Sequence, residues 1–197
     1  MVYKAAIIGC HGVGKTTLAK RLENKGFKVF NEAVINKFTG KNFFLNEVQM
    51  INDNILINEA IGREESVSIS DRFAFLDILI YVEGFYELGW ITAEQRRILY
   101  FLVNHAGHDW IFPEKLLCMN DDKQLIIDNI RRRGRKGLKE SDEKYLDTIH
   151  GLFEKFYSNE LIFEHLNPEL GEKIMRIPKH LIKGMDDLNK VMKLLEE

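Results

Sequence analysis

The 197-residue sequence has little of several features that mark particular classes of protein. Two cysteines, Cys10 and Cys118, are too few for a disulfide framework and fit a reducing compartment. Three prolines leave no room for a linker-rich arrangement, so we expect one domain over residues 1–197. Lysine and arginine (28) do not outnumber aspartate and glutamate (30), and this lack of a basic excess disfavours general binding to nucleic acid.

Long hydrophobic runs are also missing. The most apolar stretch, residues 73–82, is short and is interrupted by Asp77, so it cannot span a bilayer. The apolar run at residues 3–8 is too short for a signal peptide. We therefore expect a soluble, cytoplasmic protein with no membrane partner.

The hydrophobic pattern predicts strands that alternate with helices. Strands are expected at 3–8, 27–30, 67–70, 116–119 and 174–177, and helices at 15–24, 46–61, 73–85, 92–105, 123–133, 141–165 and 186–197. This order predicts an α/β fold of three layers, in which helices cover both faces of a five-stranded parallel sheet. Open sheets of this kind bind ligands at the edge where the strands end.

Residues 9–16, GCHGVGKT, match the pattern G-x-x-x-x-G-K-[ST]. A predicted strand precedes the pattern and a predicted helix follows it, which is the context of a phosphate-binding loop. Glycines let the backbone curl so that its N–H groups converge on phosphate oxygens. We expect ATP or GTP to be bound by Gly9, His11, Gly12, Val13, Gly14, Lys15, Thr16 and Thr17.

Two side chains of this loop have expected chemical roles. Lys15 can reach the β- and γ-phosphates, and the Thr16 hydroxyl can coordinate Mg²⁺. Thr17 and Cys10 are expected to serve the structure of the loop. The pattern predicts a protein that uses a nucleoside triphosphate, and it leaves open where the γ-phosphate goes.

Glu32 lies just beyond the second predicted strand, at the edge where the phosphate loop opens. A carboxylate at this place can accept the proton of an attacking hydroxyl, as phosphoryl transfer to an alcohol requires. The alternative is a solvated glutamate in a surface loop.

Two further carboxylates follow the third predicted strand. Asp71 suits a Mg²⁺ ligand, direct or through water, although Ser70 or Asp71 can instead cap the next helix. Asp77 has apolar neighbours at helical spacing, and a buried lone carboxylate is costly. Asp77 is therefore expected either to form an internal ion pair or to bind a polar group of a ligand.

The segment 131–139, RRRGRKGLK, carries six positive charges and no acidic side chain. In a chain that also has a phosphate loop, a basic, glycine-containing segment at about 131–141 suits a lid that closes over polyphosphate. The alternatives are a solvated basic turn and, less favoured, a local contact with RNA. The aromatic side chains of Phe38, Phe43, Phe44, Tyr81 and Phe85 either stack on a base or belong to the core.

In this order, the motifs resemble those of the deoxyribonucleoside kinase family, which is close to the thymidylate kinases. Residues 32–34, EAV, resemble the family's E-P-V, and residues 71–73, DRF, resemble its E-R-S segment. The lid is the most specific match, because RGR at 133–135 and YLDTIH at 145–150 are similar to R-G-R…Y-L-x-x-L-H at the same spacing. Ala33, Asp71 and Phe73 depart from the family's residues at their positions.

The resemblance implies a role for each matching residue. Glu32 would be the base for the 5′-hydroxyl of the sugar, Asp71 would serve Mg²⁺ and Arg72 would hold the acceptor. Arg133 and Arg135 would close over the γ-phosphate of ATP. The acceptor would be read by Gln49 and Asp77, with Phe38 near the sugar and Tyr81 among the aromatic residues beside the base.

The expected activity is therefore a Mg²⁺- and ATP-dependent nucleoside kinase that acts on a small-molecule acceptor. The resemblance also implies a homodimer joined through residues 73–85 and 92–105. One alternative is a thymidylate-type monophosphate kinase, although Asn31 stands where those enzymes have an arginine. The other is a P-loop ATPase or regulatory module with no small acceptor.

Overall fold

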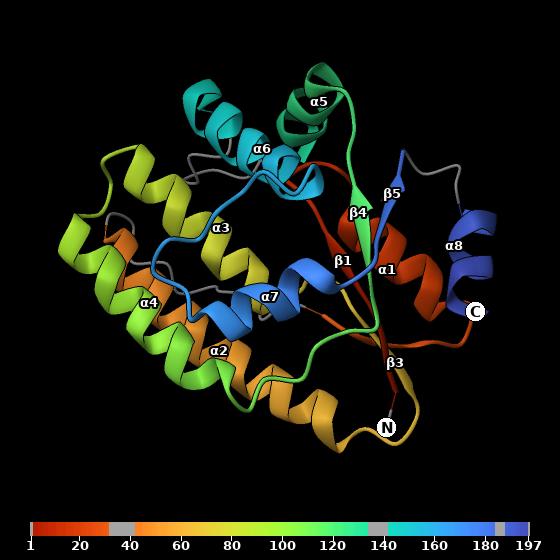
Figure 1. The fold of residues 1–197 in the computed structure, drawn as a ribbon. Helices are drawn as coiled ribbons and strands as arrows, with labels where there is room; N and C mark the ends of the chain where they lie inside the picture. Colours follow the sequence, from red (N-terminus) through yellow and green to blue (C-terminus); the bar gives the residue numbers. More distant parts are fainter. Residues whose placement is uncertain (1, 32–41, 134–141, 184–187, 197) are drawn as a thin grey trace.

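The computed structural model describes residues 2–31, 42–133, 142–183 and 188–196 (Figure 1). Five parallel strands form one sheet in the order β2-β3-β1-β4-β5. The strands are β1 (Val2–Ile8), β2 (Lys28–Phe30), β3 (Val67–Ser70), β4 (Lys115–Met119) and β5 (Lys179–Ile182). The predicted α/β fold with a five-stranded parallel sheet is confirmed.

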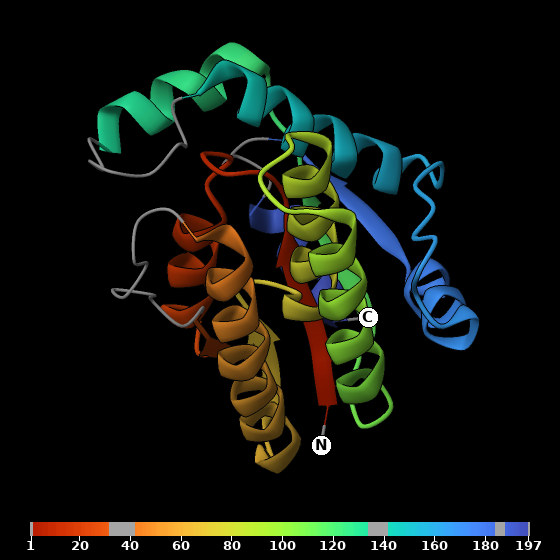
Figure 2. The same cartoon turned by 90° about the vertical axis from the view of Figure 1, so that its left-hand side faces the viewer.

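Helices cover both faces of this sheet. They are α1 (Lys15–Glu23), α2 (Phe43–Arg63), α3 (Ala74–Glu87), α4 (Ala93–Gly107), α5 (Lys123–Arg133), α6 (Glu143–Tyr157), α7 (Pro168–Arg176) and α8 (Leu188–Glu196). Figure 1 shows α1 and α8 on one side of the sheet and α2, α3, α4 and α7 on the other. Figure 2 shows α5 and α6 lying across one end of the molecule, above the loop that leaves β1.

The core is centred on β1 and α3. Residues 5–8 of β1 have no solvent-exposed surface, because β3 and β4 pair with β1 on either side. Every residue of α3 from Phe75 to Phe85 is buried, because α2, α4 and α6 pack around this helix. Polar groups on α3 are therefore held in place by packing on several sides.

Side-chain caps set the start of several helices. Asn42 accepts a hydrogen bond from the backbone N–H of Leu45 at 3.1 Å, so α2 begins before the predicted residue 46. Thr92 and Gln95 form a reciprocal capping box at the start of α4. Asp142 accepts a hydrogen bond from the backbone N–H of Tyr145, which fixes the first turn of α6.

The single helix predicted at 141–165 is wrong. Helix α6 ends at Tyr157, and Asn159 has a left-handed backbone with φ of 63°. Asparagine tolerates this conformation better than most residues, so the sequence favours a break at this point. A separate helix, α7, begins at Pro168 after Asn167 accepts a hydrogen bond from the N–H of Glu169.

The strand predicted at 174–177 is also wrong, because residues 174–176 end α7 and the last strand lies at Lys179–Ile182. Leu170 and Ile174 are buried one helical turn apart, which shows that the apolar spacing here is helical. The true strand contains Lys179 and His180, and it pairs on one side only, with β4. Polar residues are common in an edge strand, which hides it from a search for apolar runs.

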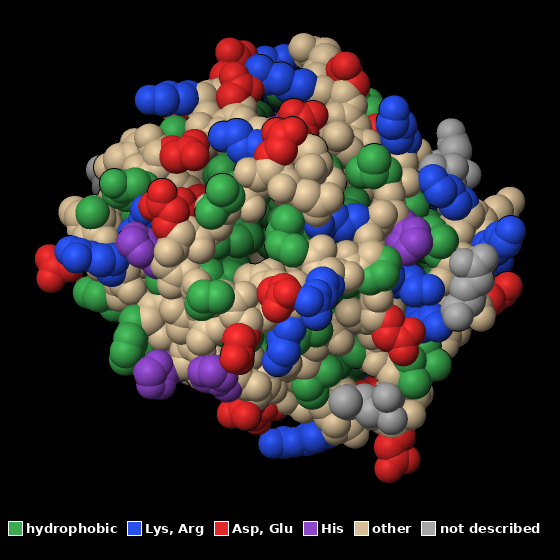
Figure 3. Space-filling model, in the orientation of Figure 1, with side chains coloured by type: hydrophobic (Ala, Val, Ile, Leu, Met, Phe, Trp, Pro, Cys, Tyr) green, Lys and Arg blue, Asp and Glu red, His purple; other side chains and the backbone are tan. Residues whose placement is uncertain are grey.

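Surface charge is mixed on the face shown in Figure 3, where basic and acidic side chains alternate without a large patch of one sign. Within the described parts of the chain, no helix is both long and apolar enough to cross a membrane.

Candidate active site

The phosphate loop joins β1 to α1 at the carboxyl edge of the sheet, as predicted. Gly12 has φ of 84°, and a Cβ atom there would lie 2.8 Å from the carbonyl oxygen of Ile126. A side chain at Gly12 would therefore be strained and would clash with α5. Gly14 precedes α1 with φ of 95°, and its carbonyl oxygen accepts hydrogen bonds from the N–H groups of Thr17 and Leu18.

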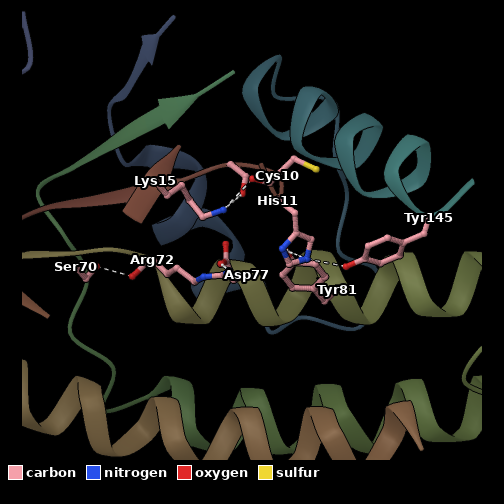
Figure 4. A network of polar contacts seen from close by, with 9 residues as sticks. Cys10, His11, Lys15, Ser70, Arg72, Asp77, Tyr81 and Tyr145 are labelled. Carbon is pink, nitrogen blue, oxygen red and sulfur yellow. Dashed lines mark hydrogen bonds and ion pairs between the residues drawn. The ribbon is translucent and has the colours of Figure 1, made fainter. Parts of the chain in front are cut away.

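Lys15 is buried within the loop that precedes it. Its ammonium donates hydrogen bonds to the carbonyl oxygens of Gly9, at 2.5 Å, and Cys10, at 2.9 Å (Figure 4). Burial, with the Arg72 guanidinium nearby, lowers the pKa of Lys15 to about 8. The charge of the Lys15 ammonium is therefore poorly solvated, and an anionic ligand would stabilise it.

The remaining loop residues divide between core and surface. Val13 is buried, whereas Thr16 and Thr17 are exposed in the first turn of α1. Hydroxyl and N–H groups at a helix N-terminus favour an anion or a hydrated metal ion. Burial raises the pKa of the Cys10 thiol to about 11, so Cys10 is a protonated packing residue, consistent with its expected structural role.

The turn between β3 and α3, with the first turn of α3, brings the charged side chains of Asp71, Arg72 and Asp77 to the same edge of the sheet. The Arg72 guanidinium forms an ion pair with Asp77 at 3.0 Å, and the Ser70 hydroxyl donates to the Arg72 carbonyl oxygen (Figure 4). Burial raises the pKa of Asp77, and Arg72 and Lys15 oppose that rise. The internal ion pair that the sequence offered as one alternative for Asp77 is therefore present.

Two carboxylate oxygens at this edge have unmet hydrogen-bonding capacity. Oδ1 of Asp71 and Oδ1 of Asp77 are buried without a hydrogen-bond partner among the described residues. A buried polar atom of this kind requires an explanation, and a bound ligand or ion is one. The ion pair of Asp77 therefore leaves its second oxygen able to bind a polar group.

His11 joins the loop to two helices. Its Nε2 lies 3.0 Å from the Tyr81 hydroxyl on α3 and 2.8 Å from the Tyr145 hydroxyl on α6 (Figure 4). Burial raises the pKa of Tyr81 well above its usual value, so this hydroxyl stays protonated. The predicted loop residue His11 and the predicted acceptor residue Tyr81 are thus in direct contact.

Aromatic rings extend this cluster. The Trp90 ring stacks on Tyr145 with an interplanar angle of 13° and on Phe43 at a centroid distance of 4.4 Å. Phe85 packs against Phe43 and Tyr81. Phe43, Tyr81 and Phe85 therefore form one wall beside the phosphate loop. Tyr145 opens the motif at 145–150 that the resemblance singled out, whereas Trp90 was not predicted.

Helix α2 places its residues differently from the expectation. Gln49 is exposed and donates a hydrogen bond to Asp53 at 2.7 Å. Glu47 is instead buried, with 4% of its surface exposed, on the side of α2 that carries Phe43. The sequence contained a signal for this, because residues 43, 47, 50, 51, 54, 58 and 61 follow one face of a helix.

The contacts at both ends of α2 place Glu47 level with Tyr81. Phe43 at the start of α2 packs on Phe85 near the end of α3. Near the other end, Asn58 bonds to Ile111, and the adjacent Phe112 packs on Phe73 at the start of α3. The two helices therefore run in opposite directions. One turn inward from the Phe43–Phe85 contact are Glu47 on α2 and Tyr81 on α3.

Several predicted residues lie outside the described part of the chain. These are Glu32, Phe38 and Arg135, together with most of the predicted lid at 131–141. Arg133 is the last residue of α5, and its side chain is not among those described.

A phosphate loop at the carboxyl edge of a parallel sheet in the order β2-β3-β1-β4-β5 defines a P-loop nucleotide-binding protein. The sequence profile of the deoxynucleoside kinase family matches residues 5–196, so the chain belongs to the deoxynucleoside kinase family. It is accordingly a phosphotransferase, as predicted, and the family favours the nucleoside kinase function over the two alternatives. No curated protein sequence matches the chain.

Solved structures of deoxyadenosine kinase from M. mycoides share this fold. The form with bound dATP has a TM-score of 0.78 and 18% identity, covering 98% of this chain and 100% of that chain. The form with bound dCTP has a TM-score of 0.71 and 19% identity, covering 98% of both chains. The form with the products dCMP and a flexible dCDP has a TM-score of 0.74 and 19% identity, covering 98% of this chain and 96% of that chain.

Proposed function

We propose that this deoxynucleoside kinase transfers the γ-phosphate of ATP to the 5′-hydroxyl of its acceptor, with Mg²⁺ as the metal ion. The observation that carries the proposal is that the buried Lys15 and the ion pair of the buried Asp77 with Arg72 lie together at one edge of the sheet. The loop supplies a phosphate site, and the start of α3 supplies paired charges for a polar acceptor.

On the donor side, Lys15 and the loop N–H groups would bind the β- and γ-phosphates. Thr16 and Asp71 would hold Mg²⁺, and the buried, unpartnered Oδ1 of Asp71 fits this role because Mg²⁺ prefers oxygen ligands. The metal ion would neutralise phosphate charge as the γ-phosphoryl group moves. Among the described residues, no group of three acidic, histidine or cysteine side chains forms a ready-made metal cluster, so water and phosphate oxygens would complete the coordination.

On the acceptor side, Arg72 would orient the hydroxyl end, and Asp77 and Tyr81 would contact the base. Glu47 is better placed than Gln49 to join them, because Glu47 is buried at the level of Tyr81 whereas Gln49 faces solvent and Asp53. Gln49 would have to turn inwards to reach the same ligand.

The remaining roles rest on the sequence motifs. Glu32 would take the proton of the 5′-hydroxyl, Arg133 and Arg135 would stabilise the transferring group, and Phe38 would lie near the sugar. Positioning and neutralisation of charge would supply most of the rate enhancement.

A homodimer is part of the same proposal, in the cytoplasm, where the two free cysteines would stay reduced. Helix α3 offers little to such an interface, because its residues 75–85 are buried within the chain. Helix α4 instead exposes 42% of Ile98 and 60% of Phe101. If α4 forms the interface, Phe101→Glu should convert a dimer into a monomer in sedimentation velocity experiments. A wild-type monomer would refute this part of the proposal.

The kinase proposal is tested by ATP consumption with Mg²⁺ against nucleosides, deoxynucleosides and their monophosphates. We expect one deoxynucleoside to stimulate the wild type, and Glu32→Gln to lose at least about a hundredfold in kcat. Glu65→Gln is the matched control, because Glu65 is exposed between α2 and β3 at the opposite edge of the sheet. Stimulation by a monophosphate alone, or hydrolysis that ignores every acceptor, would refute the proposal.

A further inference from the structure

The two helices that lie across the end of the molecule both bind the tip of the phosphate loop. The Asn129 side-chain amide on α5 donates a hydrogen bond to the Gly12 carbonyl oxygen at 2.8 Å. The Tyr145 hydroxyl on α6 bonds to the ring of His11 at 2.8 Å (Figure 4). Two consecutive loop residues are thus bound to two different helices, more than 100 residues further along the chain.

Helix α5 contacts Gly12 along one face. Ile126, Asn129 and Ile130 lie at helical spacing, and a Cβ atom on Gly12 would lie 3.0 Å from the Ile130 side chain. Both isoleucines are buried, so this face is packed against the loop. The hydrogen bond from Asn129 therefore forms in a partly buried site beside this packed face.

Helix α6 holds its side of the loop tip equally firmly. Tyr145 lies in the first turn, where the Asp142 cap fixes its backbone and the Trp90 ring stacks on its side chain. Only 5% of Tyr145 is exposed. Its hydroxyl is thus held in place from both its backbone and its ring, and it presents a fixed partner to His11.

We propose that Asn129 and Tyr145 are positioning residues, which hold the phosphate loop in the shape that binds a nucleoside triphosphate. The loop has no secondary structure of its own at residues 11–13, so its tip depends on such contacts. Both contacts use a loop carbonyl or side chain, and neither uses a backbone N–H of His11 or Gly12. The N–H groups that a phosphate needs are therefore not consumed by the contacts that hold the loop.

The inference rests on the proposed function, and direct binding of ATP with Mg²⁺ separates the two. Calorimetric titration of wild type, Asn129→Leu and Tyr145→Phe gives Kd for each. Asn129→Leu removes the bond to Gly12 together with the bond that Asn129 accepts from Arg132, and Tyr145→Phe removes the bond to His11. Loss of the contact to the loop should weaken binding about three- to tenfold in each variant. Steady-state rates should show a raised KM for ATP, with the KM for the acceptor less affected in Asn129→Leu.

The control variant is Tyr100→Phe, which removes a buried tyrosine hydroxyl that donates to Glu83 at 2.5 Å, away from the loop. It should lower thermal stability without changing Kd for ATP. Because Asn129 and Tyr145 hold adjacent residues, the double variant should also deviate from the product of the single effects.

Each outcome decides one claim. If the wild type binds ATP and both variants bind equally well, the inference is wrong. If the wild type binds no nucleoside triphosphate, the proposed function is wrong instead. If Asn129→Leu does not fold, Tyr145→Phe, which removes a single oxygen atom, still tests the inference through the same titration.

Discussion

The guanidinium of Arg72 and the carboxylate of Asp77 lie 3.0 Å apart at the start of α3, with 14% and 1% of their side chains exposed. The pair neutralises two charges in a region that also contains Lys15. Because one oxygen of Asp77 faces Arg72 and the other has no described partner, one carboxylate can bind both the arginine and an acceptor.

Asp77→Asn should reduce both stability and acceptor binding. The variant breaks the ion pair of the buried Asp77 with Arg72, and breaking a buried pair typically costs about 3–5 kcal/mol of unfolding free energy. Urea unfolding measures this cost, and Asp109→Asn, at an exposed site, is the control. A loss below about 1 kcal/mol would mean that the pair is solvated rather than buried.

Binding of a nucleoside triphosphate should be coupled to protonation of Lys15. The pKa of Lys15 is lowered to about 8, and a bound polyphosphate would raise it again. Titrations at pH 8.5, in buffers with different ionisation enthalpies, should show proton uptake that disappears in Lys15→Gln. Equal binding enthalpies in all buffers would contradict the prediction.

The lowered pKa of Lys15 also affects the free energy of unfolding at alkaline pH. Between about pH 8 and 10.5, Lys15 is protonated in the unfolded chain but mostly neutral in the folded one. The unfolded state then binds more protons, so the contribution of Lys15 to the unfolding free energy rises with pH through this range. Urea unfolding of wild type and Lys15→Met at pH 7 and pH 9.5 measures it. A difference between the two proteins that does not change with pH would contradict the prediction.

Two glycine substitutions should have opposite effects. Gly12→Ala places a methyl group 2.8 Å from the Ile126 carbonyl at a φ of 84°, so it should abolish nucleotide binding and destabilise the fold. Gly151→Ala on α6 meets no atom within 4 Å and should stabilise the fold by about 0.5–1 kcal/mol. Thermal unfolding of both variants checks the prediction, which fails if Gly12→Ala binds nucleotide normally.

The ion pair between Arg96 and Glu83 joins α4 to α3 at 2.8 Å and should be important for stability. Arg96→Met leaves the buried Glu83 carboxylate without the cation of its ion pair, although the Tyr100 hydroxyl still donates to it, at an expected cost of about 3–5 kcal/mol. The double variant Arg96→Met with Glu83→Leu should recover much of this loss. If the single variant and the double variant unfold at the same urea concentration, Arg96 and Glu83 do not act as a buried ion pair.

The sequence predicts best what local patterns determine. The phosphate loop requires closely spaced glycines followed by Lys15, and the strand at 3–8 is a mostly apolar run buried in the sheet. The ion pair of Asp77 with Arg72 was also within reach, because Arg72 lies five residues before Asp77, just ahead of the helix that carries it. Boundaries were less certain where one residue decides them, as Asn159 does for the end of α6.

Contacts between distant segments could not be predicted in this way. His11 and Tyr145 are 134 residues apart, and neither residue type requires the other. The position of Glu47 depends on which face of α2 packs against α3. Gln49 and Glu47 differ by about 200° around a helix, and the resemblance to the family pointed to Gln49, which lies on the solvent-facing side.

The two hydrogen bonds that hold Lys15 have a consequence for ligand selection. The carbonyl oxygens of Gly9 and Cys10 already give the ammonium two acceptors inside its own loop. The ammonium has three N–H donors, so an incoming anion can accept the third directly but has to displace a carbonyl oxygen to gain another. Small anions that touch the loop at a few points gain little, whereas a polyphosphate also contacts groups beyond Lys15. We therefore expect the loop to bind a polyphosphate more tightly than orthophosphate.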